Sequence, residues 1–279
     1  MSGLITLTTD FGLDDAYVAA MKGVILSINP KATIVDVCHA VQPQNIAQAA
    51  FIISASYQYF PQGTIHIVVV DPGVGTERRA VLLVTPSAFF IAPDNGVLSY
   101  IIEESSLEAD EQALSIGEGE TELRWGLQAV ALTNPHFWRH PVSATFHGRD
   151  IFAPVAAYLS LGTAVADFGD LIYSLFTFPF SRPQIKQIKG EGVLTGHVIH
   201  IDHFGNLITN FRRQDLPRGK LFIEVAGHII DGVSESYAEA DELLAIIGSS
   251  GNLEVSLKNG SAARLIQAKI GSEVSITRL

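Results

Sequence analysis

Ile65-His66-Ile67-Val68-Val69-Val70 is a nearly unbroken apolar run, and it stops abruptly at Asp71-Pro72-Gly73. A run of this kind is typical of a parallel strand that helices cover on both faces. We therefore predict a buried strand over residues 65–70, with a turn directly after it.

The residues before this run alternate between two periodicities. Residues 4–8 and 33–38 are predicted strands, because apolar and β-branched side chains dominate them. Apolar side chains recur at helical spacing from Asp14 until Asn29-Pro30, and a second helical face covers residues 46–57. The order strand, helix, strand, helix, strand predicts an α/β layered fold with a central, mostly parallel sheet.

The last third of the chain has a different pattern. Its segments are short, strand-like and separated by glycine turns, which predicts a smaller all-β barrel domain. We place the α/β domain at residues 1–180 and the barrel at 190–279, with a linker within 178–192. Residues 103–122, which are acidic and contain Gly and Ser, are expected to form a surface loop without chemistry. The expected barrel strands are 193–201, 220–225, 243–247, 253–257 and 273–277.

Composition excludes several classes of protein. A length of 279 residues suggests about two domains, and 47% hydrophobic against 17% charged residues excludes an intrinsically disordered chain. The formal net charge of −11 has the wrong sign for binding nucleic acid or an anionic membrane surface. We therefore expect neither nucleic acid nor a membrane as a partner.

The single cysteine, Cys38, excludes an intrachain disulfide and a multi-cysteine zinc site. It fits a reducing compartment, so we expect a cytoplasmic protein. Apolar runs such as residues 67–70 are far shorter than the roughly 20 residues that span a bilayer, and no basic stretch precedes an apolar segment at the N-terminus. We expect neither export nor membrane insertion.

The histidines do not predict a metal site. His136 and His140 are four residues apart, but the prolines that flank them argue against a regular helix. We therefore predict no bound metal.

Two carboxylates directly follow predicted strands, Asp10 after residues 4–8 and Asp71 after residues 65–70. Ligands of open α/β sheets bind outside the carboxyl ends of the strands, so both are candidate site residues. The alternative for each is an aspartate that only bonds amides of its own turn. Asp15, which we expect in the first turn of the following helix, has a similar alternative, a favourable interaction with the helix dipole.

The segment from Asp71 to Arg79 resembles a phosphate cradle in its glycines, but it lacks the P-loop lysine and spacing. A carboxylate at its start would also repel phosphate. It is instead predicted to bring Arg78 back beside Asp71, where a guanidinium can hold an anion or a polarised water. The alternative is a surface ion pair.

His147 lies in Thr145-Phe146-His147-Gly148-Arg149-Asp150, directly before a predicted apolar helix. The glycine beside it predicts a tight, partly exposed turn at a helix start, where a neutral imidazole is favoured. A purely structural histidine is the alternative.

In the predicted barrel, Ile201-Asp202-His203-Phe204-Gly205-Asn206 is a strand end followed by a turn. A carboxylate accepts ribose hydroxyls, an aromatic ring stacks on a flat base, and a carboxamide reads hydrogen-bonding edges. Asp202, Phe204 and Asn206 together suit a nucleoside. The alternative is a turn whose Phe204 is buried in the core.

Six segments together resemble the S-adenosylmethionine hydrolases (adenosine-forming), also called SAM hydroxide adenosyltransferases. The segments are T-T-D-F-G-x-x-D from Thr8, D-V-C-H from Asp36, V-V-D-P-G-V-G-T-x-R from Val69, P-D-N-G from Pro93, F-H-G-R-D from Phe146 and I-D-H-F-G-N from Ile201. The resemblance covers nearly the whole chain. It implies an N-terminal α/β domain with a C-terminal β-barrel, a homotrimer with sites between subunits, and a relation to fluorinase and chlorinase.

The resemblance also implies roles for individual residues. The hydrolytic trio would be Asp71, Arg78 and His147, and the carboxylate at position 71 would favour water over halide. Gln44 would replace an aromatic residue that the halogenases carry near the sugar. The implied substrate contacts are Asp10 with the ribose hydroxyls, Asp15 and Asp202 with the methionine ammonium, Phe204 and Tyr237 around adenine, and Asn206 and Ser249 with polar ends of the ligand.

The expected reaction is hydrolysis of S-adenosylmethionine to adenosine and methionine by attack of water at C5′, without metal or redox cofactor. The sulfonium is already a good leaving group, so positioning a water carries most of the catalysis. Either Asp71 or His147 would accept the proton of the water. The alternatives are a halogenase of the same fold and a nucleoside-binding regulatory module without turnover.

Overall fold

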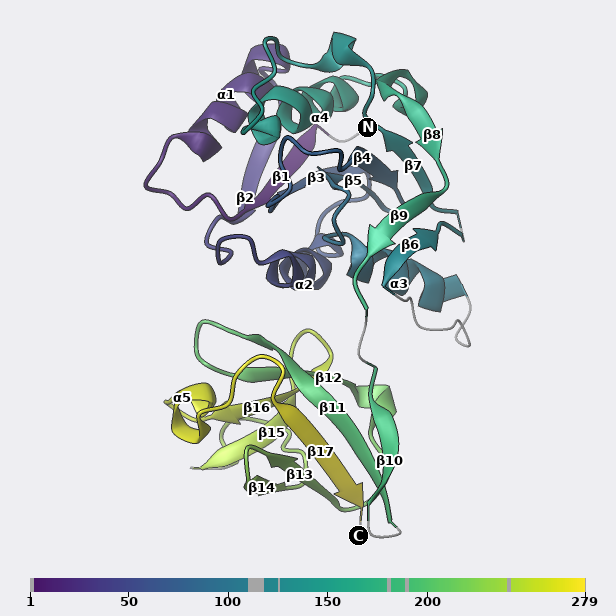
Figure 1. Ribbon diagram of the computed structural model, residues 1–279. Helices are drawn as coiled ribbons and strands as arrows, with labels where there is room; N and C mark the ends of the chain where they lie inside the picture. Colours follow the sequence, from purple (N-terminus) through teal and green to yellow (C-terminus); the bar gives the residue numbers. More distant parts are fainter. Residues whose placement is uncertain are drawn as a thin grey trace. The chain divides into compact units, whose positions relative to one another are not determined.

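The computed structural model describes residues 3–109, 118–124, 126–179, 182–188, 191–239 and 242–278. The chain divides into two compact units, Met1–Phe180 and Ser181–Leu279 (Figure 1). Within the described ranges, no helix is long and apolar enough to cross a membrane.

The α/β unit is built on a seven-stranded sheet in the order β2-β1-β3-β5-β4-β7-β8. Four neighbouring strands, β2, β1, β3 and β5, are parallel, while β4 and β8 run against their neighbours. The predicted mostly parallel sheet is therefore confirmed. The strands are β1 Leu4–Thr9, β2 Thr33–Cys38, β3 Thr64–Val69, β4 Ala80–Val84, β5 Ala88–Pro93, β7 Gln128–Ala131 and β8 Asp170–Ile172, with β6 Gly119–Glu122 and β9 Ser174–Thr177 forming a separate ribbon.

Helices cover both faces of this sheet, with α1 and α4 on one side and α2 and α3 on the other (Figure 1). The side chains of β3 alternate between two apolar cores. Ile65 and Ile67 pack with α1 and α4, whereas Val68 packs with α2 and α3. Burial on both faces explains why the sequence of β3 is continuously apolar. The helices are α1 Tyr17–Ile28, α2 Ile46–Tyr57, α3 Ser99–Ala109 and α4 Ala153–Ser160.

Two expectations for this unit are wrong in part. The first helix begins at Tyr17 after an N-cap at Ala16, so Asp15 precedes the helix instead of lying in its first turn. Within the surface loop predicted over 103–122, α3 continues to Ala109 and β6 begins at Gly119. Ile101 and Ile102 near the start of this helix pack into the core. Residues 110–117 of the predicted loop lie outside the described residues.

The C-terminal unit is an eight-stranded antiparallel sheet that curls into a barrel-like form (Figure 1). All five strands expected there are present, as β11 Glu191–Ile201, β13 Leu221–Val225, β15 Leu243–Ile247, β16 Asn252–Leu257 and β17 Glu273–Arg278. Three were missed, namely β10 Gln184–Ile188, β12 Leu207–Arg212 and β14 His228–Asp231, and a short helix, α5 Ala262–Ile266, precedes β17.

The predicted linker over 178–192 is too long, because Gln184 to Ile188 pairs with β11 along its length. Three of the five residues of β10 are polar and the side chains of residues 184–187 are exposed, so its sequence lacks the apolar content of an interior strand.

Candidate active site

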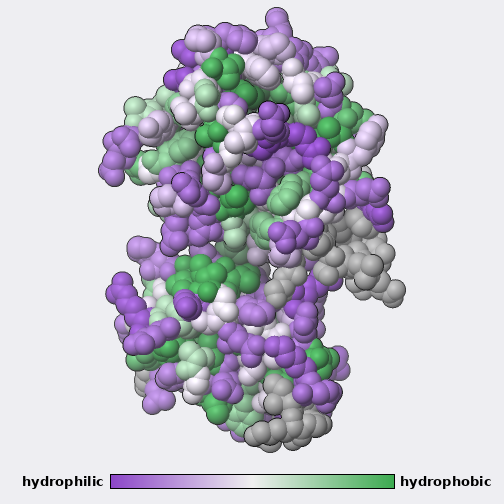
Figure 2. Space-filling view, viewed as in Figure 1, coloured by the Kyte–Doolittle hydropathy of each residue, from purple (hydrophilic) through white to green (hydrophobic). Residues whose placement is uncertain are grey.

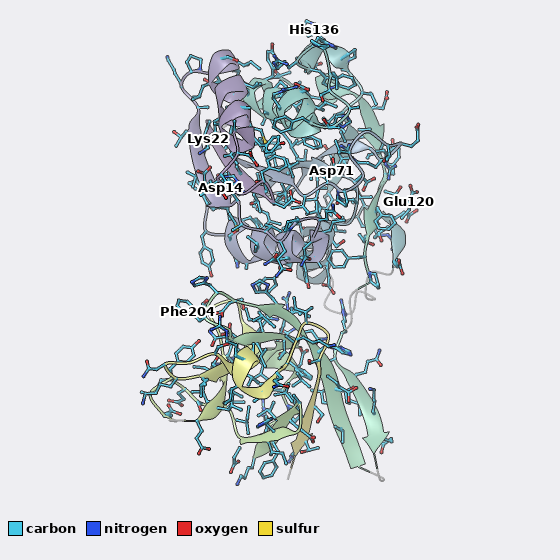
Figure 3. The ribbon with its side chains drawn as sticks, turned by 60° about the vertical axis from the view of Figure 1, so that its left-hand side comes forward. Asp14, Lys22, Asp71, Glu120, His136 and Phe204 are labelled. Atoms are coloured by element: carbon cyan, nitrogen blue, oxygen red, sulfur yellow. The ribbon has the colours of Figure 1, made fainter. Side chains whose placement is uncertain are left out.

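Asp71 and Asp10 lie at one edge of the α/β sheet. Asp10 directly follows β1 and Asp71 follows Val70 at the end of β3, and these two strands are parallel neighbours. Parallel strands end on the same side, so the fold brings the two carboxylates to one edge, as expected. Figure 3 marks Asp71 within the α/β unit.

A tight turn returns the chain from Asp71 to Arg78. The amide of Val74 donates to the Asp71 carbonyl and the amide of Thr76 to the Gly73 carbonyl. Arg78 then binds the Asp71 carboxylate through two nitrogens, Nε to Oδ1 at 2.9 Å and Nη2 to Oδ2. The two side chains are only 9% and 5% exposed, so the alternative of a surface ion pair is wrong. This is a buried, doubly hydrogen-bonded pair.

His147 joins the same guanidinium. Its Nδ1 lies 2.8 Å from Nη2 of Arg78. Arginine only donates hydrogen bonds, so Nδ1 must be the acceptor and the neutral ring carries its proton on Nε2. Burial lowers the pKa of His147, and the charge of Arg78 lowers it further. The predicted neutral imidazole is thus supported by two independent features.

Asp10 is held by a neighbouring loop. Its Oδ2 accepts a hydrogen bond of 2.8 Å from the backbone amide of Gln44. Gln44 has a left-handed backbone conformation, with φ of 66°. Asp15 is exposed.

An aromatic cluster that the sequence analysis missed lies beside His147. Phe11, Tyr17 and Phe146 pack edge-to-face or tilted, with ring centroids 5.2 to 5.6 Å apart. Phe11 and Phe146 each stand inside a quoted motif, so their aromatic character was the available signal. The cluster lies beside the turn that carries His147.

A pocket of about 820 Å³ opens on the C-terminal unit. The turn between β11 and β12 forms one wall of it, with Asp202, Phe204 and Asn206 among the lining residues. Figure 2 shows apolar surface at the end of the unit where this turn lies. Figure 3 labels Phe204, which belongs to the turn.

Phe204 is 73% exposed, so the alternative of a ring buried in the core is wrong. Asp202 organises the turn, because its Oδ1 accepts from the amides of Phe204 and Asn206 and its Oδ2 accepts from the Asn206 side chain. The turn therefore presents its aromatic ring to solvent on a hydrogen-bonded frame.

Tyr237 also lines this pocket. Burial raises its pKa, and the nearby charge of Glu254 raises it further. Ser249 is exposed, in the turn from Gly248 to Gly251, and is not among the described residues that line the pocket. Five further polar residues line the pocket and were not predicted as site residues, namely His203, Lys258, Asn259, Ser261 and Arg264.

The described part of the chain contains no group of three or more His, Cys, Asp or Glu side chains arranged to hold a metal ion. His140 instead pairs its Nε2 with the Pro135 carbonyl at 2.9 Å, and His136 lies in a short 3₁₀ turn.

Comparison with known proteins matches both units of the chain. Residues 5–169 match the SAM hydroxide adenosyltransferase N-terminal domain and residues 196–275 match its C-terminal domain. The (R)-S-adenosyl-L-methionine hydrolase of Salinispora arenicola is 35% identical over 98% of this chain and 97% of its own length.

More distant relatives carry another name. The fluorinase of Actinoplanes sp. is 27% identical over 99% of this chain and 97% of its own length. An uncharacterised conserved protein from Thermotoga maritima has the same fold in its crystal structure, with a TM-score of 0.83 and 32% identity over 98% of this chain and all of that one. Since both domain models and several full-length relatives agree, this chain belongs to the SAM hydroxide adenosyltransferase family.

Proposed function

We propose that this protein hydrolyses S-adenosyl-L-methionine to adenosine and L-methionine. Water attacks C5′ in line with the sulfonium, the C5′–S bond breaks with its electron pair on sulfur, and one proton is released from the water. The observation that carries the proposal is the buried cluster of Asp71, Arg78 and His147 at the edge of the sheet. Family membership and relatives named for this hydrolysis support it.

The hydrogen bonds within the cluster assign a role to each member. The single lone pair of neutral His147 is already used by Arg78, so Nε2–H is left to donate to the oxygen of a water. Asp71 keeps a further lone pair on each carboxylate oxygen, and it is the group that accepts the water's proton. Arg78 keeps the carboxylate and the imidazole in place relative to each other.

The substrate residues complete the proposal. Phe204 stacks on adenine with Tyr237 beside it, Asp10 accepts the ribose hydroxyls, and Asp15 and Asp202 face the methionine ammonium. Asn206 and Ser249 contact polar ends of the ligand. The formal charge of −11 favours a cationic substrate over an anionic one.

One product analysis tests this function. Purified protein is incubated with S-adenosylmethionine in chloride buffer, with the two sulfonium epimers offered separately because relatives are named for the (R) form. We expect adenosine and methionine. A main product of 5′-chloro-5′-deoxyadenosine would replace hydrolysis with halogenation, and tight binding without conversion would favour a regulatory module.

The proposal includes a cytoplasmic homotrimer with sites between subunits. It rests on family resemblance, on the lone Cys38 and on the distribution of the site residues over two units of the chain. Light scattering tests the assembly, because an active species at the monomer mass of 30.1 kDa would contradict it.

A further inference from the structure

We propose that Asp150 is a positioning residue for His147, and that its buried carboxylate holds the segment Ser143–His147 so that the imidazole meets Arg78. This inference deepens the proposed hydrolysis and rests on it for its kinetic consequence. It concerns a residue that touches neither Asp71 nor Arg78 through any hydrogen bond that the structure shows among the described residues.

Asp150 is fully buried, and its carboxylate accepts hydrogen bonds from three different residues. Arg149 binds it through Nε and Nη2, each at 2.7 Å, and Arg139 Nη1 lies 3.3 Å away. The backbone amide of Ser143 donates to Oδ2 at 2.9 Å. The bond from Ser143 attaches the first residue of the segment to Asp150, which lies three positions after His147 at its end.

Backbone bonds extend this attachment. The amide of Asp150 donates to the Phe146 carbonyl at 3.2 Å, and the Asp150 carbonyl accepts from the Arg139 amide at 2.8 Å. Burial disfavours the charged carboxylate, but the hydrogen bonds from Arg149 and Ser143 outweigh it and lower the pKa of Asp150. The segment is therefore fixed around an anion and not around a neutral group.

The turn that carries Arg78 also packs closely against the same segment. A Cβ atom on Gly75 would lie 2.4 Å from the Ala144 carbonyl oxygen, and Gly75 has a positive φ of 79°. Only glycine allows this approach. The loop of Arg78 and the segment of His147 thus interlock directly, and a shift in one is transmitted to the other.

Gly148, the residue after His147, is also closely packed. A Cβ atom on Gly148 would meet Met21 Sδ at 3.2 Å and Val69 Cγ1 at 3.5 Å. Gly148 lies at the start of a π-helical turn, Gly148–Phe152, with the backbone close to β3. Close packing at Gly75 and Gly148 and the hydrogen bonds of the Asp150 carboxylate thus act on the same segment.

The test compares Asp150→Asn with Asp170→Asn in the full chain. Asp170 accepts one hydrogen bond from Thr133 in the same unit and lies on β8, so it controls for the loss of a carboxylate. Arg149→Lys, which keeps the positive charge and loses the two-nitrogen fork, is the milder variant if Asp150→Asn does not fold. Turnover, KM and the tautomer of His147 by nitrogen NMR are measured for each.

We expect Asp150→Asn to lower kcat by about 100-fold with little change in KM. A displacement of a catalytic group by about 1 Å lowers the rate by about this factor. The His147 signals should lose the pattern of protonated Nε2 and acceptor Nδ1. Asp170→Asn should match the parent in both measurements.

Two results would overturn the inference. One is a folded Asp150→Asn protein, or Arg149→Lys protein, with normal kcat and a merely lower melting temperature. The other is an unchanged His147 tautomer in whichever of these two variants folds. If the parent protein does not hydrolyse S-adenosylmethionine at all, the proposed function fails, and the NMR measurement alone still decides whether Asp150 positions His147.

Discussion

The edge of the α/β sheet and the pocket of the C-terminal unit use their polar groups in opposite ways. At the sheet edge, Asp71 and Arg78 are buried and bonded to each other, with His147 bonded to the same guanidinium. In the pocket, Asp202 accepts hydrogen bonds from the backbone amides of Phe204 and Asn206 and from the Asn206 side chain, and Phe204 is 73% exposed. The sheet edge keeps charged groups in a fixed geometry, whereas the turn in the pocket exposes an aromatic ring to solvent.

This difference separates catalysis from binding. Charges aligned before the substrate arrives need no reorganisation during the reaction, so they contribute to the transition state. An exposed ring gains its free energy when a ligand covers it, in the ground state and the transition state alike. We therefore expect substitutions in the Asp71, Arg78 and His147 cluster to change kcat, and substitutions of residues that only contact the substrate, at the sheet edge or in the pocket, to change KM.

The largest effect is expected for Asp71→Asn. The substitution keeps the shape and removes the charge, so loss of the proton acceptor should lower kcat by 10²- to 10⁴-fold, or about 3–5 kcal/mol of barrier. Asp10→Ala is the matched comparison and should mainly raise KM, because a ribose contact exists in both states. Steady-state kinetics with binding calorimetry measures both. A near-normal kcat in Asp71→Asn would break the contrast between the two regions.

The next effect concerns acid stability of the α/β unit. Burial lowers the pKa of His66 to about 4, and its ring stacks on Phe90 in the core. The unfolded chain takes up this proton first, so stability is full above pH 6.5 and falls by about 3 kcal/mol as the pH drops to about 4.

Calorimetric unfolding across this range checks the acid effect, with His66→Gln as the control. The variant should lose stability at every pH but show a flatter acid slope. The parent and the variant having the same slope would show that His66 does not carry the effect. His147, whose pKa burial also lowers, contributes to the slope that remains in this unit.

A smaller effect is expected for Phe204→Ala. Stacking of a base on an aromatic ring is worth about 1–3 kcal/mol by alanine substitution, so KM should rise roughly 5- to 150-fold with kcat nearly unchanged. Ile229→Ala, an exposed apolar residue on β14 outside the described pocket lining, should leave both constants unaltered. An equal fall in kcat for Phe204→Ala would place the ring in the chemistry and remove the distinction.

The smallest effect is expected for chelation. Water is activated in this proposal by Asp71, Arg78 and His147 alone, so prolonged treatment with a chelator should leave turnover as it was. Restoration of a lost activity by a divalent ion would require a different account of the sheet edge.

The strands and helices that could be predicted from the sequence are those with a strong local pattern. β3 was predictable because burial on both faces leaves a nearly uninterrupted apolar run, and β15 because its apolar residues end at a glycine turn. β10 was not, because its sequence is largely polar and long-range pairing with β11 stabilises it. The extension of α3 to Ala109 was not either, because the sequence after residue 102 is mostly polar. Strong local patterns were sufficient only where burial is extreme.

The candidate site divides along the same line. The sequence by itself determined which chemical groups stand at strand ends and turns, since Asp10, Asp71 and Asp202 each follow an apolar strand. Only the tertiary structure decided that Arg78 Nη2 serves Asp71 and His147 at once, and that Ala144 needs Gly75 opposite it. The Arg78–His147 contact joins residues 69 positions apart, and Gly75 and Ala144 are equally distant in the chain. Their geometry depends on how the two loops pack at one sheet edge, which no local pattern encodes.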